Sequence, residues 1–418
     1  MKSIIVTSPS KNLKGVITLP ASKSISNRLL MIRTLSGIDF PIHNLSVAED
    51  TLLLLRLLEE IHEHRDDQIP ELDTDNAGTV MRFLTACLSN RPGRWVLTGS
   101  DRMKQRPLAI LVEALNTLGA SIDYLGKIGY PPLLIKGRPL TGKEVTIDAG
   151  ISSQYSTALM LIAPYLPSGL ILHHKGTVAS SPYLNMTSRL MTSFGIRVRH
   201  AKQRITIDKG VYHPSDYTVE ADWSSAAFWY EAAVFAKEVD LQLNGLFSDS
   251  LQGDAVLPSV FQPFGICTEY NTNGVRLTKT RERPKGFYFN FNDYPDIAPA
   301  VITTCAVLGT RSRFEGLRSL RIKETDRLNA LKNELDRLIT GIAISGNTDP
   351  LPIMEFGPGK PHFQPEMTFE TYGDHRMAMT FAPMALLIEK ARIVDPEVVV
   401  KSYPGFWKDM KEVGFVIQ

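Results

Sequence analysis

Six times along the chain, a short polar phrase runs directly into a longer stretch of apolar and small residues. The phrases are rich in Ser, Asn, Asp and Arg, and the first three of these residue types cap helix N-termini. The apolar stretches have little polar surface on any side, which is typical of helices that are buried all round. The pattern therefore predicts six buried helices, which begin near Lys23, Asn76, Ser152, Asp222, Pro295 and Asp374.

Between these stretches lie segments with one apolar and one polar face, which predict surface helices. Several of them end at a glycine between two apolar residues, a sequence typical of a helix C-cap. The residues after the glycine often alternate like a strand, as in IRVRH and RITID. The surface helices are expected at 48–61, 106–119, 181–195, 253–265, 323–339 and 404–414.

One buried helix, one surface helix and short strands make up a unit of α/β structure, and this unit recurs at similar intervals. A chain of 418 residues is too long for one ordinary core, so the six units are expected to form two domains of three. The boundary is expected near residue 220, just before Asp222. Residues 1–20 hold two strand-like runs that could pair with either domain.

Composition narrows the class of protein. The net charge is +2 and there is no run of Lys or Arg, so nucleic acid is not an expected partner. No apolar stretch is long enough to cross a bilayer, and the first residues lack the apolar region of a signal peptide. Cys87 and Cys305 lie in apolar helical runs and are predicted to be buried free thiols. We therefore expect a cytoplasmic protein without a metal site.

The helix starts indicate what the protein binds. Helix N-termini present unpaired N–H groups and partial positive charge, so several of them around one space favour anions. Three of the six phrases add an arginine in or just after the first turn: Arg28, Arg82 and Arg376. The sequence predicts a site for several phosphates, or for a phosphate and a carboxylate.

The densest motif is RIKETDRL, residues 321–328. On a helix, Lys323 and Arg327 would share a face, and Glu324 could form an ion pair with Arg327. A solvated surface helix with ordinary ion pairs is the alternative interpretation. In DHRMAM, Asp374 is placed to cap a helix and to leave His375 and Arg376 exposed at its entrance, a pair that packing alone does not explain.

Taken in chain order, these and further motifs resemble the 5-enolpyruvylshikimate-3-phosphate synthase family of enolpyruvyl transferases. The resemblance covers nearly the whole chain, and KETDRL together with DHRMAM is a specific combination. The motifs are PASKSISNR, NAGTVMR, RMKQRPL, GYPPL, SSQYSTAL, SSPY, QGD, YPDIAP, RIKETDRL, DHRMAM and KSYPGFW.

The resemblance implies a two-domain inside-out α/β barrel with six βαβαββ-type repeats, three per domain. It implies that residues 21–220 form an N-terminal domain that binds shikimate 3-phosphate, and that 1–20 plus 221–418 form the second. The active site would lie in the cleft between them. The implied reaction transfers enolpyruvyl from phosphoenolpyruvate to the 5-hydroxyl of shikimate 3-phosphate and releases phosphate, in a monomer and without any cofactor.

The resemblance also assigns residues to roles. The phosphoenolpyruvate contacts are Lys23, Gly78, Arg106, Arg327, Arg376 and Lys401. The shikimate 3-phosphate contacts are Lys23, Ser24, Arg28, Ser152, Ser153, Gln154, Ser180, Asp296, Ser319 and Lys323. The catalytic residues are Asp296 as proton acceptor, Glu324 as proton donor, and Lys23, which touches both substrates.

Elementary chemistry is consistent with these roles. Phosphoenolpyruvate carries a carboxylate and a phosphate, which planar arginine donors bind in a bidentate manner. Adding the 5-hydroxyl requires one proton acceptor and one proton donor. A Glu among cations usually has a depressed pKa, so Glu324 needs burial or a substrate charge beside it to act as an acid.

Two positions depart from the family pattern. Ser319 stands where many members have Asn, and Phe83 stands where many have Pro. Glyphosate occupies the phosphoenolpyruvate place in this family, and a helix shift caused by Phe83 would weaken its inhibition.

Two other functions are alternatives on sequence grounds. The sister enzyme acting on a UDP-linked amino sugar usually has a Cys in the loop that reads DRMKQRP here, and this loop has none. A non-catalytic sugar-phosphate-binding protein would not need Asp296, Glu324 and Lys23, which are all present.

Overall fold

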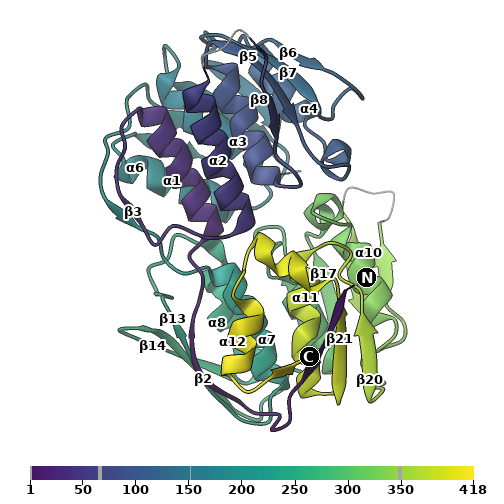
Figure 1. Cartoon of the computed structure of the whole chain (residues 1–418). Coiled ribbons are helices and arrows are strands. Elements are labelled where there is room, and N and C mark those ends of the chain that lie inside the picture. The colour runs from purple at the N-terminus through teal and green to yellow at the C-terminus, as the bar shows by residue number, and fades with distance from the viewer. Residues whose placement is uncertain (1, 65–67, 151, 347–350) are drawn as a thin grey trace. The chain divides into compact units, whose positions relative to one another are not determined.

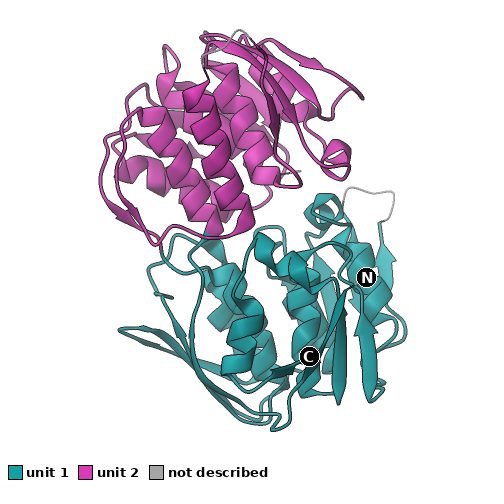
Figure 2. Ribbon diagram, in the orientation of Figure 1, with its two compact units in different colours: residues 1–22, 220–418 teal, residues 23–219 magenta. Residues whose placement is uncertain are grey.

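The computed structural model describes residues 2–64, 68–150, 152–346 and 351–418 (Figure 1). The chain divides into two compact units (Figure 2). Unit 1 comprises residues 1–22 and 220–418, and unit 2 comprises residues 23–219. The N-terminal segment therefore belongs to the same unit as the C-terminal half of the chain.

Three buried helices form the centre of unit 2. They are α1 (Lys23–Ser36), α3 (Gly78–Ser89) and α5 (Ser153–Ile162), and each contacts the other two. The amphipathic helices α2 (Glu49–Glu63), α4 (Ala109–Thr117) and α6 (Ser181–Ser193) pack against them. Two four-stranded sheets and one pair of short strands complete the unit.

The two larger sheets of unit 2 share one topology. The first has the order β4 (Glu71–Asp73), β5 (Gly93–Thr98), β7 (Leu133–Gly137), β6 (Ile122–Tyr124). The second has the order β8 (Glu144–Asp148), β9 (Leu170–Lys175), β11 (Arg204–Ile207), β10 (Val198–Ala201). In both, the first pair of strands is parallel and the other pairs are antiparallel. A buried helix connects each parallel pair, which gives the βαβαββ repeat.

Unit 1 repeats this plan around α7 (Trp223–Phe235), α9 (Ala298–Val307) and α11 (His375–Phe381), which contact one another. The shorter helices α8 (Leu257–Phe261), α10 (Arg327–Leu335) and α12 (Phe406–Glu412) lie outside them. Every residue of α7 is buried. All six buried helices predicted from the hydrophobic pattern are therefore confirmed.

The sheets of unit 1 are again four-stranded. Two are built from consecutive segments of the second half of the chain together with the N-terminal strands, and the third lies wholly between residues 286 and 356. Their orders are β2 (Leu13–Thr18), β13 (Val239–Asn244), β15 (Gly274–Lys279), β14 (Ile266–Asn271); β16 (Gly286–Asn290), β17 (Arg311–Glu315), β19 (Ile353–Phe356), β18 (Ala343–Ser345); and β20 (Glu366–Phe369), β21 (Lys390–Val394), β1 (Ser3–Thr7), β22 (Val416–Ile417).

Two strands pair in one unit although the helix that follows each of them belongs to the other unit. Strand β2 directly precedes α1 of unit 2, yet it pairs with β13 of unit 1. Strand β12 (Tyr217–Thr218) directly precedes α7 of unit 1, yet it pairs with β3 (Ile42–His43) of unit 2. The repeat that contains α1 has only this two-stranded pair within unit 2, so one of the six repeats is abbreviated.

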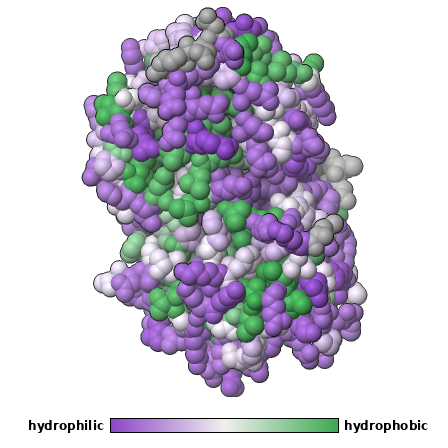
Figure 3. All heavy atoms as spheres, in the orientation of Figure 1, coloured by the Kyte–Doolittle hydropathy of each residue, from purple (hydrophilic) through white to green (hydrophobic). Residues whose placement is uncertain are grey.

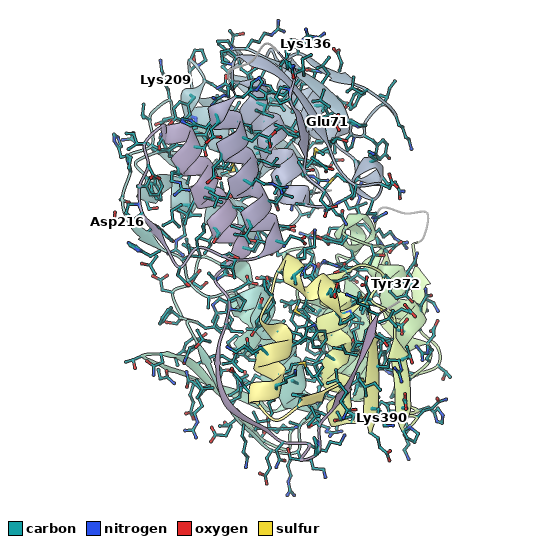
Figure 4. All side chains as sticks on the ribbon, viewed as in Figure 1. Glu71, Lys136, Lys209, Asp216, Tyr372 and Lys390 are labelled. Carbon is teal, nitrogen blue, oxygen red and sulfur yellow. The ribbon has the colours of Figure 1, made fainter. Side chains whose placement is uncertain are left out.

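The surfaces agree with the amphipathic pattern of the outer helices and strands. The face drawn in Figure 3 is mostly hydrophilic, with several hydrophobic areas between the hydrophilic ones. Figure 4 shows Lys136, Lys209 and Asp216 at the periphery of unit 2 and Lys390 at that of unit 1. Among the described residues, no helix combines the length and the apolar character needed to span a membrane.

Candidate active site

In unit 2, the N-termini of the buried helices are joined by side-chain contacts. Ser152 caps α5, because its hydroxyl accepts a hydrogen bond from the N–H of Gln154 at 3.2 Å. The side-chain amide of Gln154 donates to Oγ1 of Thr79, at the start of α3, at 3.1 Å. Thr79 comes directly after Gly78. A residue assigned to shikimate 3-phosphate thus contacts the chain neighbour of a residue assigned to phosphoenolpyruvate.

Arg28 is buried within unit 2 near the start of α1. Its Nε donates to Oγ1 of Thr187 at 2.8 Å, and its Nη1 donates to the carbonyl of Ser24 at 2.8 Å. The guanidinium carbon lies 5.8 Å from the ring centre of Phe83 and 5.9 Å from that of Tyr183. Burial lowers the pKa of Arg28 to about 10. The ring of Phe83 therefore packs beside Arg28, a residue assigned to shikimate 3-phosphate.

Gly78 begins α3 between two guanidinium groups. A Cβ atom at this position would lie 2.5 Å from Nη2 of Arg106 and 2.6 Å from Nη1 of Arg82. Arg106 is buried and donates from Nη1 to the carbonyl and the side-chain oxygen of Asn76, at 2.9 and 3.2 Å. Glycine allows two arginines to approach one helix N-terminus, where backbone N–H groups already favour an anion.

Lys23 occupies the first position of α1 and forms an ion pair with Asp50 of α2, at 2.9 Å. The side chain of Lys23 is 18% exposed, so it is largely but not completely buried. Ser153 and Ser180 are both buried. Ser180 has a left-handed backbone with φ 57° directly before α6, and its side chain makes no capping hydrogen bond. A strained residue of this kind at a helix start is compatible with a binding role.

In unit 1, Arg327 is the centre of a buried network. The residue is 1% exposed, and its Nε and Nη2 donate to the two carboxylate oxygens of Asp374 at 2.7 and 3.2 Å. Nη2 also donates to Glu324 at 2.7 Å. Burial opposes the charge, but the carboxylates of Asp374, Glu324 and Asp296 together raise the pKa of Arg327. Arg327 is therefore a fixed cation held by three acidic residues.

Asp296 gathers the other cations of unit 1. Its Oδ1 lies 3.4 Å from Nζ of Lys323, 3.3 Å from Nη1 of Arg327 and 3.4 Å from Nε of Arg376. Arg376 also donates from Nη1 to the main-chain carbonyl of Asp296 at 3.0 Å. Burial and the neighbouring arginines lower the pKa of Lys323, and the charge of Asp296 partly offsets this. One carboxylate is thus in contact with three cationic side chains.

The helix predicted at 323–339 is shorter than expected, and this corrects the argument for RIKETDRL. Helix α10 begins at Arg327, because Asp326 caps it by accepting from the N–H of Asn329 at 3.1 Å. A 3-10 helix ends at Ile322, and Lys323 has an extended backbone. Lys323 and Arg327 therefore meet at Asp296 through a bend in the chain and not along a helix face. The predicted ion pair of Glu324 with Arg327 is confirmed.

Asp374 caps α11 as expected, because it accepts from the N–H of Arg376 at 2.9 Å. The expectation of an exposed pair at the helix entrance is wrong, since His375 and Arg376 are both buried. Their burial is possible because the carboxylates of Asp374 and Asp296 lie beside the two side chains. Ser319, in the 3-10 helix Arg318–Ile322, and Lys401, at the end of the 3-10 helix Pro396–Lys401, are also largely buried.

Sequence reasoning gave no role to Asp254, although the motif QGD contains it. Asp254 is 2% exposed and accepts a hydrogen bond from the hydroxyl of Ser224, in the first turn of α7. Burial and the negative charge of Asp296 raise the pKa of Asp254 to about 7. Only the fold reveals this, because the two acidic residues lie 42 positions apart in the chain. Asp254 is a second titratable group beside Asp296.

Among the described residues, no group of three or more His, Cys, Asp and Glu side chains is arranged to hold a metal ion.

The candidate site residues of each unit combine cationic side chains with the N-termini of buried helices. Those of unit 1 include several buried carboxylates as well. The fold and these residues define an α/β protein of repeated βαβαββ units, whose helix N-termini carry the cationic side chains that suit small anions. A sequence model of the family described as EPSP synthase (3-phosphoshikimate 1-carboxyvinyltransferase) matches residues 7–410. The chain belongs to this family, and the resemblance noted in its sequence is confirmed.

Relatives from several bacteria support the assignment. A protein of Bacteroides fragilis named 3-phosphoshikimate 1-carboxyvinyltransferase is 44% identical over 99% of this chain and 98% of its own length. A protein of the same name from Xenorhabdus nematophila is 33% identical over 97% of both chains. The solved structure of EPSP synthase from Acinetobacter baumannii is similar over the full length of both chains, with a TM-score of 0.75 and 23% identity. At that identity, the structural likeness supports the fold.

Proposed function

We propose that the two sets of residues described above act on one pair of substrates, phosphoenolpyruvate and shikimate 3-phosphate. The chain is a 3-phosphoshikimate 1-carboxyvinyltransferase of the shikimate pathway. It transfers the enolpyruvyl group of phosphoenolpyruvate to the 5-hydroxyl of shikimate 3-phosphate and releases phosphate. The cluster of Asp296 with Lys323, Arg327 and Arg376 is the observation that supports this function most strongly, because it places a carboxylate among three cationic side chains.

Unit 2 is proposed to supply mainly substrate binding. Arg106 and the backbone N–H of Gly78 bind phosphoenolpyruvate, because a guanidinium beside a helix N-terminus suits both of its anionic groups. Shikimate 3-phosphate is bound by hydroxyl, amide and cationic side chains at the starts of three helices. These side chains are Lys23, Ser24, Arg28, Ser152, Ser153, Gln154 and Ser180.

Unit 1 is proposed to supply further anion contacts and the proton chemistry. Arg327, Arg376 and Lys401 bind phosphoenolpyruvate, and Ser319 and Lys323 bind shikimate 3-phosphate. Asp296 accepts the proton of the 5-hydroxyl while the hydroxyl oxygen attacks C2 of phosphoenolpyruvate. Glu324 protonates the methylene carbon. Phosphate then leaves C2 while the carboxylate of Glu324 takes back a proton from the new methyl group, and this elimination forms the enol ether of the product.

The ion pair of Glu324 with Arg327 bears on how an acid operates at this position. Hydrogen bonding to a guanidinium at 2.7 Å favours the ionised carboxylate. An incoming phosphoenolpyruvate brings negative charge to the same guanidinium, which favours the protonated form of Glu324. Substrate binding is thus proposed to prepare the acid for the addition step.

Asp296→Asn and Glu324→Gln test these roles, because each variant keeps the shape of the side chain and removes proton exchange. We expect turnover to fall by about 10²–10⁴ in each, as is usual when a general acid or base is lost. Phosphate release with shikimate 3-phosphate is the measurement, and UDP-N-acetylglucosamine is the control acceptor. Turnover close to that of the wild type would remove the substituted residue from the mechanism.

We also propose a monomer in the cytoplasm. Each unit encloses its own buried helices, so neither needs a second copy to cover its core. The three cysteines are free, which suits a reducing compartment. Cys87 and Cys305 are buried as predicted, whereas Cys267 is exposed. Burial raises the pKa of Cys87 to about 11. Light scattering of the purified protein would test the monomer, and a dimeric mass would overturn it.

A further inference from the structure

The carbonyl of Pro107 accepts two partly buried hydrogen bonds in unit 2. The hydroxyl of Tyr155, on α5, donates to it at 2.6 Å, and Nη2 of Arg82, on α3, donates to it at 3.4 Å. Tyr155 is 1% exposed, so this hydroxyl is hydrogen-bonded out of reach of water. Pro107 comes directly after Arg106. The main chain beside Arg106, which is proposed to bind phosphoenolpyruvate, is therefore held by side chains from two helices, α3 and α5.

Tyr155 and Arg82 also lie next to residues assigned to both substrates. Arg82 donates from Nη1 to the carbonyl of Gly78 at 2.9 Å, and its guanidinium carbon lies 5.8 Å from the ring centre of Tyr155. Tyr155 is the next residue after Gln154, which donates to Thr79. A short chain of contacts thus runs from the start of α5, through Tyr155 and Pro107, to Arg106.

We infer that the hydroxyl of Tyr155 is a positioning group for phosphoenolpyruvate binding: it holds the Pro107 carbonyl and thereby the loop that presents Arg106. The inference rests on the proposed role of Arg106. The loop needs such support because Arg106 lies between a 3-10 helix (Met103–Gln105) and α4 with an extended backbone, φ −93° and ψ 124°. Proline lacks an N–H, so at residue 107 only the carbonyl is available to hold the main chain.

Tyr155→Phe removes the hydroxyl and keeps the ring. A hydrogen bond of this kind makes a modest contribution, so we expect the KM for phosphoenolpyruvate to rise about threefold to tenfold. The KM for shikimate 3-phosphate and kcat should change by about twofold or less, because Arg106 is displaced and the proton-transfer groups are not. Steady-state kinetics with each substrate varied in turn separates these quantities.

Tyr212→Phe is the matched control. Tyr212 is equally buried in unit 2, and its hydroxyl donates to a main-chain carbonyl, that of Leu161, at 2.9 Å. That carbonyl is not adjacent to a proposed substrate ligand. Both variants should lower the thermal midpoint similarly, but only Tyr155→Phe should raise the KM for phosphoenolpyruvate.

Arg106→Lys separates failure of this inference from failure of the proposed function. Lysine cannot make the bidentate contact, so its KM for phosphoenolpyruvate should rise more than that of Tyr155→Phe. If Arg106→Lys raises this KM and Tyr155→Phe does not, the positioning role is overturned and the function stands. If Arg106→Lys has no effect, the assignment of Arg106 fails, and the inference fails with it. An equal rise in Tyr212→Phe and Tyr155→Phe would also overturn the positioning role.

Discussion

At the scale of single residues, the core of unit 1 contains a carboxylic acid that the proposed reaction does not use. Glu231 lies within α7 and is fully buried, and neither of its carboxyl oxygens has a hydrogen-bond partner among the described residues. Burial raises the pKa of Glu231 well above its ordinary value. The folded protein therefore keeps this proton to a higher pH than the unfolded chain does, and the side chain destabilises the fold more as pH rises through that range.

Glu231→Gln should relieve this effect. In the wild type, the unfolded chain loses this proton near pH 4.5 and the folded chain keeps it, so stability falls as pH rises above that value. The advantage of Glu231→Gln should grow by up to about 1.4 kcal/mol per pH unit. Urea unfolding at pH 5 and pH 8 measures it. Glu63→Gln, on the exposed side of α2, is the control, and parallel pH profiles for all three proteins would contradict the expectation.

Gly78 allows a second prediction at this scale. A methyl group there would overlap the guanidinium groups of Arg106 and Arg82, both of which are buried and hydrogen-bonded. Gly78→Ala should therefore displace Arg106 and raise the KM for phosphoenolpyruvate by about tenfold or more, while the KM for shikimate 3-phosphate changes less. Gly357→Ala is the control, since a Cβ there meets nothing within 4 Å. Equal kinetics for the two variants would show that the arginines yield without loss.

At the scale of elements, helix caps place the proposed site residues. Asp374 and Asp326 each end an irregular segment and start a helix whose first residues bind within the network of unit 1. A cap here does more than satisfy an N–H group, because it determines where the helix begins. Where the helix begins in turn determines that Arg327 points into the network while Lys323 approaches it from the preceding bend.

Asp326→Ala tests this relation. Loss of the cap should lower the free energy of unfolding by about 1 kcal/mol and should also reduce kcat/KM, because Arg327 is the first residue of α10. Asp326→Asn keeps a capping side chain and should stay close to the wild type in both properties. Thermal unfolding and steady-state kinetics of the two variants are the measurements. A loss of stability in Asp326→Ala with unchanged kcat/KM would separate the cap from the site.

At the scale of the whole molecule, the two units differ in which parts of the chain form them. Unit 2 is one continuous segment, whereas unit 1 needs residues from both ends of the sequence. Strand β1 lies between β21 and β22 in its sheet, and β2 forms the edge beside β13. Removing the first residues would therefore take a central strand out of unit 1.

Fragments should reproduce this asymmetry. Residues 23–219 should fold alone and give a cooperative thermal transition by circular dichroism, because their buried helices and sheets are complete. Residues 220–418 should not, since a sheet without β1 leaves hydrogen-bonding edges unpaired. Adding a peptide of residues 1–22 should restore its transition. A cooperative transition of 220–418 without the peptide would contradict the role given to β1.

Much of this protein can be predicted from sequence alone. The hydrophobic pattern predicts six buried helices, and caps such as Ser152, Asp222 and Asp374 mark where three of them start. These features are local, because an N-cap and an apolar stretch depend on neighbours within one or two turns. The motifs were specific enough to indicate the family, and comparison with known proteins confirms it.

Only the tertiary structure decided which distant groups meet. The sequence holds no local sign that β1 and β2 join sheets with β21 and β13, because strand pairing depends on partners far along the chain. Nor does it indicate that Asp254 lies beside Asp296, or that Tyr155 holds Pro107. Such contacts are made when separate elements pack, and packing also sets the burial that shifts the pKa of Asp254 and Glu231.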